Sequence, residues 1–147
     1  MSDTIKTIAI NTGGGDAPGL NAVIHGAVYA ARGLGWRILG IREGYDGMLE
    51  PERYPDGGLV ELRRSVVREI SHLGGTILST TNRGNPFRRV VEQPDGSTRE
   101  VDYSGELIRR FRDKKIDALI AVGGDGSLII ANELHKKGLC VVGAQDD

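Results

Sequence analysis

Two glycine-rich turns, far apart in the chain, constrain the fold more than any other feature. The first is residues 12–22 (Thr-Gly-Gly-Gly-Asp-Ala-Pro-Gly-Leu-Asn-Ala), and the second is residues 122–127 (Val-Gly-Gly-Asp-Gly-Ser). Each turn lies between an apolar run typical of a buried strand and a run with helical periodicity. Glycines lack a Cβ atom, so backbone N–H groups can approach an anion, and the positive end of the following helix faces the same place. Together the turns predict a phosphate-binding site in an α/β protein.

The first turn belongs to a predicted strand–helix–strand unit. Residues 7–11 are apolar and β-branched, as in a buried parallel strand. Pro18 suits the first position of the following helix, and Gly33 and Gly35 suit its end. Residues 36–41 predict the next strand. The helical period predicts a buried stripe made of Leu20, Ile24, Ala27, Val28 and Ala31.

The second turn is flanked in the same way. Residues 116–122 predict a strand, residues 128–137 a helix that ends at Gly138, and residues 139–142 a further strand. The single cysteine, Cys140, falls within this last apolar run, and we interpret it as a small core residue. No internal repeat or linker interrupts the chain, which indicates one domain.

The segment between the two units predicts shorter elements. Residues 59–72 predict a short strand and then a helix, and residues 76–78 predict a strand. Residues 90–101 predict a hairpin around an Asp-Gly turn. Residues 104–112 predict a helix capped by Ser104. The inward positions of the two helices are predicted to be Val66, Val67, Ile70, Leu107, Ile108 and Phe111.

Composition limits the classes of partner. The 147 residues match one domain, since a domain has roughly 100–200 residues. The formal net charge of −1 gives no broad electrostatic reason to expect nucleic acid or an anionic membrane as a partner. No apolar segment approaches the roughly 20 residues that a membrane helix requires, and the first residues lack the profile of a signal peptide. We therefore expect a cytoplasmic protein that binds small molecules.

Four motifs in this order and spacing resemble the ATP-dependent 6-phosphofructokinases. They are residues 12–22, residues 44–47 (Gly-Tyr-Asp-Gly), residues 74–78 (Gly-Gly-Thr-Ile-Leu) and residues 123–127 (Gly-Gly-Asp-Gly-Ser). The resemblance covers nearly the whole chain. It implies a three-layer αβα, Rossmann-like fold with a mostly parallel sheet, and the transfer of phosphate from ATP to the 1-hydroxyl of fructose 6-phosphate. Relatives assemble as homo-oligomers, so the resemblance implies the same here.

The resemblance also implies roles for individual residues. Gly15 would present backbone to the ATP phosphates, and Gly124, Asp125, Gly126 and Ser127 would form the second side of the site. Asp125 would hold Mg²⁺, and a carboxylate at the end of a strand suits an ion that keeps several waters. An aspartate before Gly-Ser-Leu could equally be a helix N-cap.

Gly126 bears on the choice of phosphoryl donor. Relatives that use pyrophosphate tend to carry aspartate at this position, where its side chain would occupy the space of the ATP α-phosphate. Glycine therefore favours ATP, and the resemblance leaves a pyrophosphate-dependent enzyme as an alternative.

For two further residues, the sequence leaves two possible roles open. Tyr45 aligns with a family residue near the nucleotide, but an aromatic between two glycines could also pack on the sheet as a lid. Arg83 lies close to a family arginine that bridges nucleotide and sugar phosphate, with Asn82 at the aligned position. The alternative for Arg83 is a solvated loop arginine, although a guanidinium suits the bridging of phosphates.

The chain departs from the family at two places. His25 and Tyr29 stand where bacterial relatives have two arginines that bind an allosteric nucleotide, which puts that regulation in doubt. The family continues with a Thr-Ile-Asp-Asn-Asp segment that carries the catalytic base, whereas this chain reads Gly-Ala-Gln-Asp-Asp at residues 143–147. We expect residues 1–147 to be the nucleotide-binding part of an incomplete phosphofructokinase fold, without the sugar-phosphate-binding part, with no catalytic residue and with exposed apolar surface.

The sequence is also compatible with two other functions. NAD and lipid kinases also carry a Gly-Gly-Asp-Gly turn, although the first turn argues against them. A nucleotide-binding module that performs no chemistry would keep the same fold.

Overall fold

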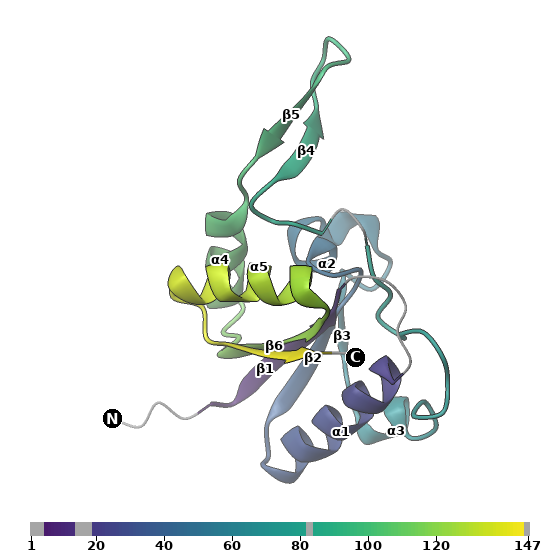
Figure 1. Cartoon of the computed structure of the whole chain (residues 1–147). Helices are drawn as coiled ribbons and strands as arrows, with labels where there is room; N and C mark the ends of the chain where they lie inside the picture. Colours follow the sequence, from purple (N-terminus) through teal and green to yellow (C-terminus); the bar gives the residue numbers. More distant parts are fainter. Residues whose placement is uncertain (1–4, 14–18, 82–83, 146–147) are drawn as a thin grey trace.

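Alternating apolar side chains along the central strands cover both faces of a parallel sheet. In the computed structural model, which describes residues 5–13, 19–81 and 84–145, five strands form this sheet in the order β3-β2-β1-β6-β7 (Figure 1). All neighbours are parallel except β3, which pairs antiparallel with β2. The bounds are β1 (Thr7–Thr12), β2 (Arg37–Ile41), β3 (Leu59–Glu61), β6 (Ala118–Gly123) and β7 (Val141–Gln145).

Helices cover the two faces of the sheet, so the expected three-layer α/β fold is confirmed. One face carries α1 (Leu20–Gly33) and α3 (Arg64–Val67), and the other carries α4 (Ser104–Asp113) and α5 (Asp125–Lys136) (Figure 1). Between β2 and β3 lie α2 (Asp46–Leu49) and a short 3₁₀ helix (Pro51–Arg53). The predicted hairpin is confirmed as β4 (Arg89–Glu92) and β5 (Thr98–Val101), and it projects away from the sheet.

Successive side chains of β1 point to opposite faces of the sheet, so the core is divided into two clusters. Ile8 and Ile10 pack with α1 on one face, and Ala9 packs with α4 and α5 on the other. All three side chains are at most 5% exposed. Both faces of β1 are therefore apolar, as a central parallel strand requires.

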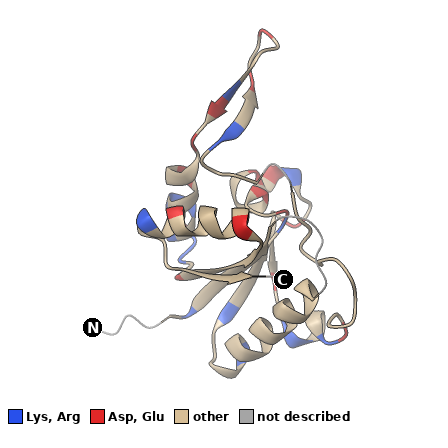
Figure 2. Ribbon diagram, in the orientation of Figure 1, with Lys and Arg blue, Asp and Glu red and all other residues tan. Residues whose placement is uncertain are grey.

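The stripe predicted for α1 is confirmed at four of its five positions, and Ala27 is only partly buried. Leu20, Ile24 and Val28 are fully buried, and Ala31 is 2% exposed. The helix ends as predicted, because Gly35 adopts a φ of +79° and its N–H group donates to the carbonyl of Arg32 at 3.0 Å. Figure 2 shows that α1 is almost free of charged residues, whereas the hairpin carries both signs.

Several local predictions are wrong. Residues 76–78 form a turn and not a strand. The helix predicted within residues 59–72 is short, because α3 ends at Val67. Val67 and Ile70 are buried as predicted, but Val66 is 44% exposed. Ser104 is not the cap of α4. It is the first residue of the helix, and its N–H and hydroxyl groups donate to Asp102 Oδ1 at 2.8 and 2.6 Å.

The edge strand β7 leaves apolar surface exposed, as expected. Val142 is 60% exposed, and Ile129 on α5 is 65% exposed. Cys140 is exposed as well, so its interpretation as a core residue is wrong. It precedes β7 at the amino end of the edge strand, where it lines an open hollow. Among the helices of the described residues, none has the length and the apolar character needed to cross a membrane.

A close approach of two glycines shapes the loop after β2. A Cβ atom on either Gly47 or Gly58 would overlap the carbonyl oxygen of the other. The carbonyl of Gly58 accepts from Arg42 N at 2.9 Å, and the carbonyl of Arg42 accepts from Gly47 N at 2.9 Å. This contact fixes where α2 begins, and with it the position of Tyr45.

We predict that Gly58→Ala destabilises the chain by about 1–3 kcal/mol more than Gly57→Ala, the range typical of overpacking. Both glycines have positive φ values, +86° and +83°, so both substitutions carry the same backbone strain. A Cβ on Gly57 would meet nothing within 4 Å, so only Gly58→Ala adds a clash. Urea unfolding measures the difference, and equal losses for the two variants would contradict the steric argument.

Candidate functional site

A cavity of about 240 Å³ lies at the carboxyl ends of β1 and β6. Open α/β sheets bind ligands at this edge. The ends of the strands supply Asn11, Gly13, Ala121 and Val122, and the first two turns of α5 supply Gly126, Ser127 and Ile130. The loop after β2 supplies Gly44 and Tyr45, and the segment that follows the turn at residues 76–78 supplies Thr81, Gly84 and Asn85.

The two glycine-rich turns meet in this cavity. Gly13 N donates to the carbonyl of Val122 at 2.8 Å, which extends the pairing of β1 with β6 into the turns. A Cβ on Gly13 would lie 2.5 Å from Ser127 Oγ, and a Cβ on Gly123 would lie 2.6 Å from Ser127 Cβ. Glycine is therefore required at Gly123, whereas a side chain at Gly13 would force the Ser127 hydroxyl to move. Of the predicted residues, Gly126, Ser127 and Tyr45 line the cavity, and Gly15 lies outside the described residues.

Gly124 and Asp125 lie next to the cavity and do not line it. Gly124 is the N-cap of α5 and Asp125 is the first helical residue, so α5 begins three residues before the predicted position and the N-cap interpretation of Asp125 is wrong. The Asp125 side chain is exposed, and its Oδ1 accepts from Gln145 Nε2 at 3.2 Å. A carboxylate in the first turn is favoured by the positive end of the helix.

Tyr45 is buried in the core and also borders the cavity. Its side chain is 5% exposed and belongs to the core beneath α4 and α5, yet it also lines the cavity. Burial raises the pKa of Tyr45 to about 12, and a side-chain hydrogen bond with Asn11 acts in the opposite direction. The hydroxyl is therefore neutral at physiological pH, and the ring is a fixed wall rather than a mobile lid.

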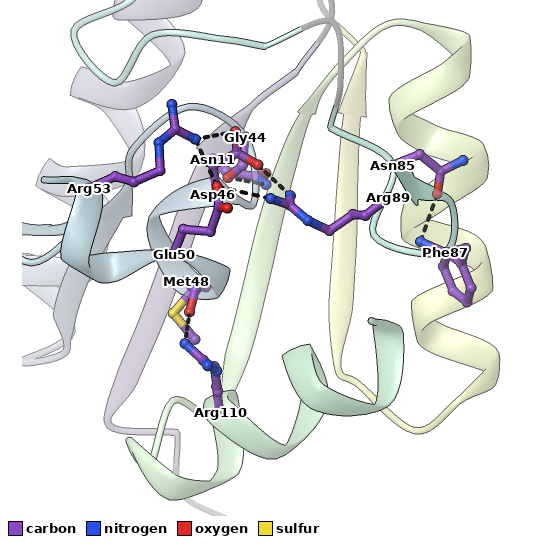
Figure 3. A network of polar contacts seen from close by, with 10 residues as sticks. All are labelled: Asn11, Gly44, Asp46, Met48, Glu50, Arg53, Asn85, Phe87, Arg89 and Arg110. Carbon is purple, nitrogen blue, oxygen red and sulfur yellow. Dashed lines mark hydrogen bonds and ion pairs between the residues drawn. The ribbon is translucent and has the colours of Figure 1, made fainter. Parts of the chain in front are cut away.

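Asn11 and Asn85 are cavity residues that the sequence reasoning missed. Asn11 is 3% exposed, and its Nδ2 donates to the carbonyl of Gly44 at 3.1 Å (Figure 3). A buried amide at the carboxyl end of an apolar strand is the signal that could have identified it. Asn85 lies in a loop, where its Oδ1 accepts from Phe87 N at 2.9 Å. An Asn-Pro turn indicates only local geometry, so nothing in the pattern singled it out.

The turn that replaces the predicted strand at residues 76–78 supports the cavity. Thr12 Oγ1 lies 3.0 Å from Thr76 Oγ1 and donates to the carbonyl of Ser79 at 3.2 Å. The carbonyl of Leu78 accepts from Glu43 N at 2.9 Å, which ties the turn to the loop before Tyr45. Ser79 has a φ of +64°, in the left-handed region that residues other than glycine rarely adopt. Arg83, which follows this turn, lies outside the described residues.

The residues around the cavity are suited to a metal ion that binds together with a phosphate ligand. Within residues 5–13, 19–81 and 84–145, no three His, Cys, Asp or Glu side chains come together as a metal-binding group. A single exposed carboxylate, Asp125, stands at the start of α5. Mg²⁺ commonly binds one or two carboxylates together with substrate phosphates and water. Asp125 therefore fits Mg²⁺ bound together with a phosphate group.

The cavity suits a ligand with one anionic and one apolar part. Gly13, Gly126 and the first turn of α5 offer close backbone and a positive helix end. Tyr45 and Ile130 offer an aromatic and an aliphatic surface at the same cavity.

The family match and the relatives described below all carry the name phosphofructokinase or describe a fructose 6-phosphate phosphotransferase. Residues 7–145 match the family described as phosphofructokinase. The ATP-dependent 6-phosphofructokinase 1 of Synechocystis sp. is 41% identical over 136 residues, which cover 91% of this chain and 35% of the relative. The ATP-dependent 6-phosphofructokinase of Chloroflexus aurantiacus is 38% identical, with 97% of this chain and 38% of the relative covered. The pyrophosphate–fructose 6-phosphate 1-phosphotransferase of Dictyoglomus thermophilum is 35% identical over 92% of this chain and 34% of the relative.

Solved structures agree with the sequence relatives. The phosphofructokinase of Pichia pastoris in the T-state superposes with a TM-score of 0.75 at 29% identity, covering 100% of this chain and 16% of that one. The phosphofructokinase of Saccharomyces cerevisiae gives a TM-score of 0.70 at 28% identity, over 97% of this chain and 20% of that one. This chain spans about a third of the length of its curated relatives. By the match over residues 7–145, by its relatives and by its fold, the chain belongs to the phosphofructokinase family.

Proposed function

We propose that this chain forms the ATP-binding part of a 6-phosphofructokinase, which converts ATP and fructose 6-phosphate to ADP and fructose 1,6-bisphosphate. The observation that carries the proposal is the cavity in which Gly13 of the first turn meets Gly126 and Ser127 of the second. The names of the relatives from Synechocystis and Chloroflexus support ATP as the phosphoryl donor. The proposal includes a cytoplasmic enzyme that assembles as a homo-oligomer.

Different lining residues of the cavity contact the phosphates and the nucleoside of ATP. The phosphates lie against Gly13, Gly126 and Ser127, and we assign Gly15 and Gly124 the role of presenting further backbone N–H groups to them. The nucleoside lies between Tyr45 and the apolar side of α5, beside Gly84 and Asn85, which line the same cavity. Arg83 bridges the phosphates, for which a guanidinium is well suited.

Phosphoryl transfer needs little covalent chemistry from the protein, because it depends on positioning and on neutralising the charge of the moving group. When bound at Asp125, Mg²⁺ would supply part of that neutralisation. The turns and the start of α5 supply the remainder and hold the phosphates in place. We assign no residue of this chain the role of base on the sugar hydroxyl.

Pyrophosphate is the second candidate donor, because the relative from Dictyoglomus is named for it. Gly126 favours ATP, since it lines the cavity without a side chain. A Cβ at this position would meet nothing within 4 Å, so the backbone leaves room for a ligand at this point. A carboxylate here would stand in the cavity wall and repel a phosphate.

We predict that the chain binds ATP in the presence of Mg²⁺, and that Asp125→Asn weakens this binding about tenfold, or about 1.4 kcal/mol. The variant removes the charge that holds the ion and keeps the size of the side chain. Calorimetry with Mg²⁺ and then with a chelator measures the effect. Without Mg²⁺, the two proteins should bind ATP with similar affinity.

Two results would count against these assignments. Equal ATP affinity of Asp125→Asn and the parent chain in Mg²⁺ would remove the metal role of Asp125. Failure of the parent chain to bind ATP would overturn the proposed function itself.

We predict that Gly126→Asp lowers ATP affinity by about tenfold or more, because a carboxylate facing a phosphate is repelled in a partly desolvated site. Gly126→Asn is the matched control, with nearly the same volume and no charge. Open space at Gly126 and its place in the first turn of α5 mean that neither variant should lose stability, which thermal melting verifies. If Asn and Asp weaken ATP binding equally, the effect is steric and the charge argument fails.

A further inference from the structure

Four charged side chains beside the cavity form a network that the proposed phosphate contacts do not use (Figure 3). Arg89 Nη1 donates to Asp46 Oδ1 at 2.6 Å, and Arg89 Nη2 lies 3.0 Å from Glu50 Oε2. Arg53 Nη1 donates to Glu50 Oε2 at 2.8 Å and lies 3.6 Å from Asp46 Oδ2. Two guanidinium groups thus balance two carboxylates.

Burial distinguishes one pair within this network. The side chains of Asp46 and Arg89 are 7% and 14% exposed, whereas those of Glu50 and Arg53 are 36% and 50% exposed. Arg53, and to a smaller degree Arg89, hold the pKa of Glu50 below its ordinary value. Water screens the outer pair, so the Asp46–Arg89 contact is the one in which loss of a partner leaves a buried charge uncompensated.

This pair joins two segments that form different sides of the cavity. Asp46 directly follows Tyr45, which lines one side. Arg89 begins β4 and follows the turn that starts at Asn85, which lines the other side. That turn is held by Arg88 N, which donates to the carbonyl of Asn85 at 3.1 Å. A displacement of Arg89 would therefore move Asn85 as well, because a hydrogen-bonded turn joins them.

Helix α2 depends on such outside contacts, because four residues are too few to form a stable helix alone. Near its other end, the carbonyl of Met48 accepts from Arg110 Nη1 at 2.8 Å (Figure 3). Arg110 fixes α2 against α4, and Arg89 fixes its first residue against β4. Neither contact involves β6 or the start of α5, where the proposed phosphate surface lies.

We propose that Arg89 is a positioning residue that sets the separation between the Tyr45 side and the Gly84–Asn85 side of the cavity, and so determines how well the nucleoside part of the ligand fits. This inference rests on the proposed function. The phosphate part of the ligand contacts Gly13, Gly126 and Ser127, whose positions come from the sheet and α5. Arg89 therefore affects one end of the ligand and not the other.

The test compares two ligands that share the phosphate part. Calorimetry measures binding of ATP with Mg²⁺ and of inorganic tripolyphosphate with Mg²⁺ to the chain and to Arg89→Gln. We expect about tenfold weaker ATP binding, because the nucleoside loses contacts when the two segments shift, and little change for tripolyphosphate. Arg89→Lys, which can keep one charged contact, should recover part of the loss.

Arg109→Gln is the matched control. Arg109 also pairs with a carboxylate, Glu106 Oε1, at 2.6 Å, but its side chain is 60% exposed and its contact lies within α4. The control should bind both ligands as the parent chain does. Because Arg89→Gln leaves the buried Asp46 with only its longer contact to Arg53, at 3.6 Å, the double variant Asp46→Asn/Arg89→Gln is measured as well, and it should show the same selective loss of ATP affinity.

The outcomes separate this proposal from the proposed function. Equal weakening of both ligands would overturn the positioning role, because it would show general damage to the site. Unchanged ATP affinity in Arg89→Gln or in the double variant would overturn it too, while leaving ATP binding intact. A parent chain that binds neither ligand would overturn the proposed function and this inference together.

Discussion

The pairing of β1 with β6 is the contact on which the rest of the structure depends. Its register runs from Ile8 opposite Ala118 to Thr12 opposite Val122. The strands are far apart in sequence, and their parallel pairing brings both carboxyl ends to the same edge of the sheet. The bond from Gly13 N to the carbonyl of Val122 continues the ladder one residue into the turns. A shift of one residue in this register would turn each side chain to the opposite face and separate the glycines from one another.

Steric limits then decide how closely the turns can approach. Ser127 fits between Gly13 and Gly123 because neither has a side chain. The same principle operates at Gly47 and Gly58, where two backbones touch and thereby set the direction of the chain before α2. Glycine lowers stability in most regular structure, since it loses more conformational freedom on folding than other residues. At Gly47, Gly58 and Gly123 the loss is offset by close contacts that a side chain would prevent.

The sequence predicts the parts of the fold whose burial repeats with a regular period. The helix at residues 20–33 and the strands around both turns follow from such periods, and the structure confirms them. The turn at residues 76–78 does not, because Ile77 and Leu78 look like a strand. Their N–H groups instead donate to side chains, that of Ile77 to the distant Asn21 and that of Leu78 to Thr76 within the turn. Asn85 was missed for a related reason, since its place in the cavity depends on contacts of its neighbours with α2 and α4. Local pattern cannot specify contacts that only the tertiary fold creates.

Charge was the least predictable part of the site. The network of Asp46, Glu50, Arg53 and Arg89 joins segments that no motif connects, and a buried ion pair contributes little net stability once its desolvation is counted. Apolar residues of similar volume could hold α2 in place with equal or greater stability. An ion pair differs from them in direction, because a guanidinium and a carboxylate bond in a fixed geometry whereas apolar surfaces can slide. In a cavity whose sides come from short, irregular segments, fixed direction matters more than strength, and this is the physical reason to connect the network with recognition of the ligand rather than with stability.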